Sequence, residues 1–84
     1  MNTKQRATLA KVHATPILKD ILWADVESLF RATGGTVQSV GGSAVAVRYG
    51  KQRAIFHRPH PQPTIYVKDV ERIRRFLERV GVKP

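Results

Sequence analysis

The strongest constraint on the fold of this chain is a two-residue turn between two segments of alternating hydrophobicity. The segments are Ser43–Tyr49 and Gln52–His57, and only Gly50 and Lys51 separate them. Two such segments joined by so short a turn predict a β-hairpin with a single register. In that register one face is apolar, whereas the other is basic and carries a histidine. The apolar face pairs Val45 with Phe56 and Val47 with Ala54, and the opposite face pairs Arg48 with Arg53, Ala46 with Ile55, and Ala44 with His57.

Segments with helical periodicity lie on both sides of the hairpin. Residues 23–33 and 70–80 repeat apolar side chains at helical spacing, and glycines follow both segments. Asp69 is the predicted N-cap of the later helix. A shorter helix is predicted over residues 3–13, with Thr3 as its N-cap. The predicted buried faces consist of Trp23, Val26, Leu29 and Phe30 in one helix and of Val70, Ile73, Phe76, Leu77 and Val80 in the other.

The order of these elements predicts an α+β fold. A short strand over Thr36–Val40 completes a three-stranded antiparallel sheet, with helices on one face and the other face open. A chain of 84 residues has room for one modest core. We interpret residues 1–15 as an N-terminal extension that is in part helical, and residues 16–84 as the domain itself.

The charge of the chain is strongly positive and unevenly distributed. Fifteen Lys and Arg against six Asp and Glu give a net charge of +9. Residues 1–42 hold five bases and three acids (+2), whereas residues 43–84 hold ten bases and three acids (+7). Such a balance indicates a polyanionic partner, with nucleic acid as the first candidate and an anionic membrane surface as the second.

Several classes of protein are excluded or disfavoured by the residues present. The absence of cysteine excludes disulfide frameworks, thiolate zinc sites and cysteine nucleophiles. No apolar run approaches the roughly 20 residues of a membrane span, and no secretion signal is recognisable, so we expect a cytoplasmic protein. His57 and His60 have no third ligand nearby, so neither a metal site nor a cofactor is expected.

Four short motifs follow one another in an order typical of a known family. They are Gly34-Gly35 after a helix rich in Leu and Phe, Gly42-Ser43-Ala44-Val45-Ala46-Val47, Phe56-His57-Arg58-Pro59-His60-Pro61, and Val80-Gly81-Val82. Over about residues 17–83 the chain resembles the HicA family. The resemblance implies a fold like that of double-stranded-RNA-binding domains. It also implies a toxin of a bacterial toxin–antitoxin system that cleaves messenger RNA and is neutralised by a HicB antitoxin.

The chain departs from the family pattern at one position. The family motif is Gly-Ser-His with a catalytic histidine, and Ala44 stands at the matching place. An alanine side chain accepts and donates no proton, so this chain is expected to be weak or inactive as a nuclease. Three explanations stay open: a deliberate replacement, a divergent branch that uses another residue, or an inactive RNA-binding relative.

The remaining candidate site residues are histidines and cations. Metal-independent RNA cleavage needs a base that takes the 2′-hydroxyl proton and cations that stabilise the transition state. His57 is the first candidate for the base because the register places it beside Ala44, and His60 follows it in the proline-rich loop. The candidate RNA contacts, on or beside the open face of the sheet, are Ser43, Arg48, Lys51, Arg53 and Arg58.

A second basic group lies on the last predicted helix, where either RNA or an antitoxin is a candidate partner. Arg74 and Arg75 can pair with Glu71 and Glu78 at helical spacing, whereas Arg72 and Arg79 are less neutralised. The sheet group is therefore favoured for substrate. The alternative function is a non-catalytic RNA-binding module. A membrane-surface role comes third, because no helix pairs a basic face with large exposed apolar side chains.

Overall fold

The hairpin is present with the predicted register. In the computed structural model, which describes all 84 residues, β2 (Ala44–Tyr49) pairs antiparallel with β3 (Gln52–His57). Val45 lies opposite Phe56 and Ala44 opposite His57. β1 (Thr36–Gly41) pairs antiparallel with the other side of β2, so the strand order is β1-β2-β3.

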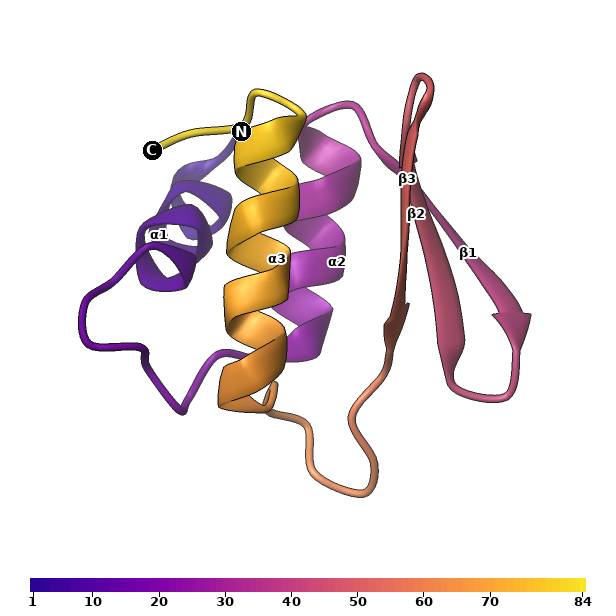
Figure 1. Cartoon of the computed structure of the whole chain (residues 1–84). Coiled ribbons are helices and arrows are strands. Elements are labelled where there is room, and N and C mark those ends of the chain that lie inside the picture. Colours follow the sequence, from indigo (N-terminus) through magenta and orange to yellow (C-terminus); the bar gives the residue numbers. More distant parts are fainter.

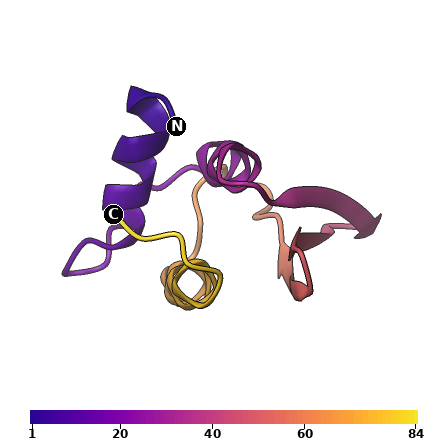
Figure 2. The same cartoon turned by 90° about the horizontal axis from the view of Figure 1, so that it is seen from above.

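Three helices lie on one side of this sheet and leave its other face open. α2 (Trp23–Ala32) and α3 (Val67–Arg79) form the layer next to the strands (Figure 1). α1 (Thr3–Val12) lies beyond that layer, on the side away from the sheet (Figure 2). The predicted α+β class is therefore confirmed, and the arrangement is that of a small fold like the double-stranded-RNA-binding domain. None of the three helices is long and apolar enough to cross a bilayer.

The core lies between the sheet and the helix pair, and its centre is aromatic. Fifteen buried apolar side chains form the core, which extends to α1 through Leu9 and Val12. They include every one predicted for α2 and, among those predicted for α3, all except the half-buried Val80. Phe30 of α2 stacks on Phe56 of β3 at 5.9 Å between ring centroids and meets Phe76 of α3 edge-on at 6.3 Å. These rings join the sheet to both helices, and burying one such side chain contributes about 1.5–3 kcal/mol.

α1 packs against the helix pair through apolar and polar contacts. Leu9 and Val12 are 2% and 1% exposed. The Arg74 guanidinium donates hydrogen bonds to the carbonyl oxygens of Val12 and Ala14, both at 2.8 Å. The expected pairing of Arg74 and Arg75 with Glu71 and Glu78 is wrong, because neither arginine lies within ion-pair distance of an acid. Arg74 turns instead toward the end of α1.

Two predicted helix N-caps are wrong, by one residue in α1 and by three residues in α3. α1 is capped by Asn2 instead of Thr3: the Asn2 side chain accepts the Gln5 N–H at 2.8 Å, and the Gln5 side chain accepts the Asn2 N–H at 2.9 Å. α3 begins at Val67, before the predicted cap Asp69. The segment ahead of α3 is held by a hydrogen bond from Ile65 N–H to Ile21 C=O, at 2.9 Å. That contact links residues far apart in sequence, so local cap chemistry did not reveal it.

Candidate nucleic-acid interface

The sequence-predicted histidines meet the first turns of α3 in one hollow of the surface. This hollow has a volume of about 540 Å³ and lies where β2 begins, β3 ends and α3 begins. We call it the histidine pocket. Its lining consists of Ser43, His57, Arg58, Pro59, His60, Tyr66, Lys68, Asp69 and Arg72.

His57 is held by its neighbour across the hairpin end. The Ser43 hydroxyl lies 3.2 Å from His57 Nδ1, and both residues are exposed. This contact leaves the other ring nitrogen, Nε2, without a hydrogen-bond partner in the chain. An imidazole oriented through one nitrogen and free at the other has the form that acid–base chemistry requires.

Ala44 lies beside His57 on the open face of the sheet. The two residues are direct cross-strand partners. The next residues along, Ser43 and Arg58, share a backbone hydrogen bond of 2.9 Å, so Ala44 and His57 form the closer, non-hydrogen-bonded type of pair. Their Cβ atoms in such a pair are about 5 Å apart. A longer side chain at position 44 would therefore reach the His57 ring.

At the start of α3 the pocket is lined by Tyr66, Lys68 and Asp69, which were not sequence candidates for a ligand contact, and by Arg72, which belonged to the second basic group. Lys68 is exposed and has no carboxylate partner. Arg72 donates to the Ile55 carbonyl oxygen at 2.9 Å and lies 3.7 Å from Asp69. The spacing of Lys68 and Arg72 places them on one helix face, but only the tertiary structure brings that face to the histidines.

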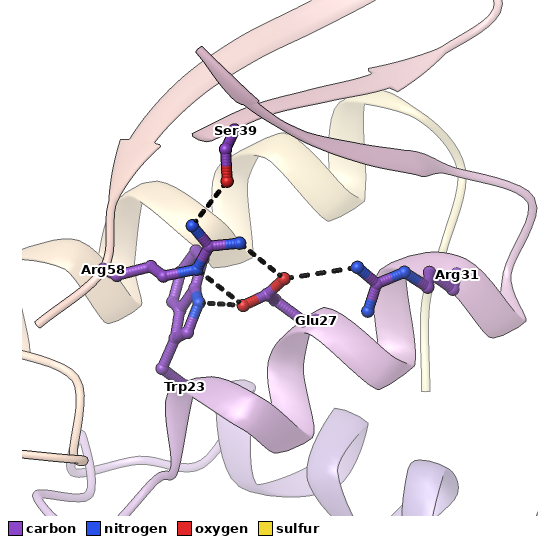
Figure 3. A network of polar contacts seen from close by, with 5 residues as sticks. All are labelled: Trp23, Glu27, Arg31, Ser39 and Arg58. Carbon is purple, nitrogen blue, oxygen red and sulfur yellow. Dashed lines mark hydrogen bonds and ion pairs between the residues drawn. The ribbon is translucent and has the colours of Figure 1, made fainter. Parts of the chain in front are cut away.

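Arg58 lies at the pocket, but its guanidinium group is already engaged. His57 faces the open side of the sheet, so the alternation of a strand turns Arg58 toward α2. There it donates to Glu27 at 3.1 and 3.3 Å and to the Ser39 hydroxyl at 2.8 Å (Figure 3). The prediction that Arg58 is a cation free for phosphate needs correction, because Glu27 balances its charge.

Glu27 is the centre of this network. Its side chain is 12% exposed and also accepts hydrogen bonds from the Trp23 indole and, at 3.4 Å, from Arg31 (Figure 3). The network joins α2 to β1 and to the end of β3. The hydrogen bonds of Arg58 therefore hold the start of the loop that carries His60, and they leave its positive charge unavailable to a ligand.

The other predicted RNA contacts lie apart from the histidine pocket. Arg48 and Arg53 are exposed and face each other across β2 and β3, and they line a separate hollow of about 200 Å³ on the open sheet face. Lys51 is in the hairpin turn. Four residues of strand separate Ala44 from Arg48, which corresponds to about 13 Å. The predicted cations are thus divided between two places on the surface.

No cluster of three or more His, Cys, Asp or Glu side chains has the arrangement of a metal site. The histidine pocket instead combines two imidazoles, a hydroxyl and basic side chains at the start of α3, where unpaired helix N–H groups add partial positive charge. This combination suits a phosphate-bearing ligand.

A family model agrees with this arrangement. The model for the HicA toxin of bacterial toxin–antitoxin systems matches residues 23–82. Comparisons with curated proteins and with solved structures return no match. The matched segment contains α2, the complete sheet and α3, and therefore the whole histidine pocket and the aromatic core behind it. By this match over most of its length, the chain belongs to the HicA toxin family of bacterial toxin–antitoxin systems.

Proposed function

We propose that this HicA-family chain binds messenger RNA at the histidine pocket and has the scaffold of a metal-independent endoribonuclease. The observation that carries the proposal is the meeting of His57 and His60 with the basic start of α3 in one hollow. In the proposed reaction the 2′-hydroxyl of a nucleotide attacks the adjacent phosphorus and displaces the 5′-oxygen. One imidazole takes the hydroxyl proton, another protonates the leaving oxygen, and cations stabilise the charge on phosphorus.

Ala44 limits what the chain does as it stands. The family resemblance assigns the catalytic histidine to this position, and the methyl group of alanine takes no part in proton transfer. Of the two histidines at the pocket, only His57 is the cross-strand partner of position 44, and it supplies one of the two proton-transfer groups. We therefore propose that this chain binds RNA but cleaves it weakly or not at all, and that a histidine at position 44 restores the missing group beside His57.

An antitoxin partner follows from membership of a toxin–antitoxin family. We propose that this partner is an acidic HicB-like protein that docks over the basic surface and that both proteins act in the cytoplasm. The net charge of +9 supports an acidic partner, because opposite charge accelerates association and disfavours wrong partners.

The decisive experiment compares RNA cleavage by the parent chain and by the Ala44→His variant, with EDTA present. Ala46→His is the matched control: Ala46 lies on the same face of β2, but its cross-strand partner is Ile55 and it lies about 7 Å further along the strand. We expect Ala44→His to cleave at least about 100-fold faster than the parent, the low end for a positioned proton-transfer group. The control should stay at the parent rate, and adding His57→Ala to Ala44→His should remove the gain.

A non-catalytic RNA-binding module is the second candidate, and Ala44 is the observation that favours it. This candidate predicts salt-sensitive RNA binding by the parent and no cleavage by Ala44→His. If Ala44→His stays at background while it binds RNA as the parent does, the nuclease mechanism is wrong for this scaffold and the binding module remains.

A further inference from the structure

Four cations on α3 form a single exposed line that starts at the histidine pocket. Lys68, Arg72, Arg75 and Arg79 are spaced by four, three and four residues, so they project from one face of the helix. All four are exposed. We call this line the α3 stripe. Eleven residues of helix separate its ends, which corresponds to about 16 Å.

The α3 stripe has few carboxylates to neutralise it. Asp69, 3.7 Å from Arg72, is the one acidic side chain within ion-pair distance of any of the four. Glu71 and Glu78 form no ion pair with these cations, and Glu78 lies 3.9 Å from His13 of the N-terminal segment. The charge of Lys68, Arg75 and Arg79 is therefore available to a ligand.

A second hollow connects the α3 stripe with the edge of the sheet. It has a volume of about 170 Å³ between β3 and α3 and is lined in part by Arg72, Arg75 and Arg79. Arg72 also lines the histidine pocket, so the two hollows are neighbours through one side chain. Contacts with the core orient the guanidinium groups: that of Arg72 lies 4.9 Å from the Phe56 ring centre, and that of Arg79 lies 5.2 Å from the Phe76 ring centre.

The second hollow offers exposed cations without an exposed large apolar anchor, which suits a nucleic-acid backbone. Protein interfaces depend on exposed apolar or aromatic anchors near their centre. The exposed large apolar side chains of the chain are Met1, Leu22, Val40, Tyr66 and Val67, and none of them lines the second hollow. Phosphate binding requires cations in a line and no apolar anchor.

We propose that the α3 stripe is a track for the backbone of one single-stranded RNA, which leads the strand into or out of the histidine pocket. A stacked strand carries one phosphate per about 3.4 Å, so the stripe has room for about five. Tyr66, 45% exposed at the pocket end, offers a ring on which an unpaired base stacks. This inference rests on the proposed RNA binding and names the path that the strand takes.

The test measures how RNA affinity depends on salt. The probe is a short, unstructured, fluorescently labelled RNA with 2′-O-methyl groups, which cannot be cleaved through the 2′-hydroxyl. The R75Q/R79Q variant removes two cations from the far end of the stripe and leaves the pocket intact. The R6Q/K19Q variant is the matched control: it removes the same charge from exposed residues outside the stripe that have no ion-pair partner.

Log affinity falls as log salt rises, and each phosphate contact contributes about 0.7 to the steepness of that fall. Loss of two contacts should therefore make the slope shallower by about 1.4. We expect this reduction in R75Q/R79Q, the parent slope in R6Q/K19Q, and the parent slope again in R75K/R79K, which keeps the charge. Circular dichroism checks that each variant is folded, and the charge-keeping variant separates lost contacts from lost packing.

A parent slope in folded R75Q/R79Q would overturn the inference and leave the proposed RNA binding intact. If that variant also fails to associate with the cognate antitoxin, the stripe is a protein-docking surface and the inference is again overturned. A parent chain with no measurable affinity for the RNA would overturn the proposed function and the α3 stripe as an RNA track together.

Discussion

Arg58 shows how one side chain can lie at a site without being available to a ligand. It lines the histidine pocket, yet Glu27 and Ser39 occupy its guanidinium group. From the sequence it was grouped with the cations on or beside the open face of the sheet. The alternation of the strand, which puts His57 on the open face, was the signal that Arg58 turns the other way. Its partner Glu27, however, is 31 residues away, and no local pattern pairs them.

Tyr49 is half-buried, and its pKa is displaced. Burial raises the pKa of Tyr49 above its ordinary value, and a hydrogen bond with Thr33 opposes part of that change. The Tyr49 hydroxyl lies 2.8 Å from the Thr33 hydroxyl and donates to the Phe30 carbonyl oxygen at 3.2 Å. Gly35 lies against the same ring, where an added Cβ would come within 2.7 Å of it.

We predict that Tyr49→Phe lowers the free energy of unfolding by about 1 kcal/mol at neutral pH, the usual net value of a hydrogen bond. Above about pH 10 the unfolded chain loses its phenolic proton before the folded chain does. The parent therefore loses stability as pH rises from there toward the folded-state pKa of Tyr49, and the variant should lose less. Urea unfolding at a series of pH values measures the difference.

The control for this prediction is Tyr66→Phe, because Tyr66 is 45% exposed and no hydrogen bond holds its hydroxyl. That variant should follow the parent across the alkaline range. An alkaline decline of equal size in the parent and in Tyr49→Phe would contradict the assignment of this titration to Tyr49.

At the scale of the elements, α1 and α3 depend on contacts that run between helices. α1 lies outside the segment matched by the family model, yet it buries Leu9 and Val12 in the common core. The carbonyl groups of Val12, its last residue, and of Ala14 just beyond it accept hydrogen bonds from Arg74 of α3. Isolated helices of ten residues are marginal in water, so α1 owes its stability to this docking.

We predict that Leu9→Ala lowers the free energy of unfolding by about 2–3 kcal/mol, toward the low end for a buried leucine because α1 lies at the margin of the core. Arg6→Ala is the matched control on the same helix, since Arg6 is exposed and has no ion-pair partner. It should change the stability by less than about 0.5 kcal/mol. Equal stability of Leu9→Ala and the parent in chemical denaturation would mean that α1 is not docked in solution.

At the scale of the whole molecule, a charge of +9 is confined to a body of 31 × 29 × 21 Å. The Debye length is about 30 Å at 0.01 M salt and about 10 Å at 0.1 M. At the lower concentration, repulsion between basic groups acts across the entire molecule and favours the unfolded chain. The same repulsion is relieved when a polyanion binds.

The thermal midpoint is therefore expected to rise when sodium chloride is raised from 0.01 M to 0.1 M. The corresponding gain in the free energy of unfolding is on the order of 1 kcal/mol. The R6E/K19E variant reduces the net charge from +9 to +5, at two units per substitution, and should show a smaller rise. A midpoint that falls with salt would show instead that ion pairs such as Glu27–Arg58 outweigh the general repulsion.

Local periodicity by itself determined the hairpin register, the apolar faces of α2 and α3, and the basic sheet face with Ala44 beside His57. These features depend only on the repeat of a strand or a helix, which residues close in sequence set among themselves. The spacing of Arg72, Arg75 and Arg79 also places three cations on one face of the last predicted helix, but Lys68 joins them only because α3 begins at Val67. The tertiary structure decided the rest. It brought the start of α3 to the histidines, paired Arg58 with Glu27 and docked α1 on Arg74. These contacts join residues far apart in sequence, and only the packing of the shared core decides which of them meet.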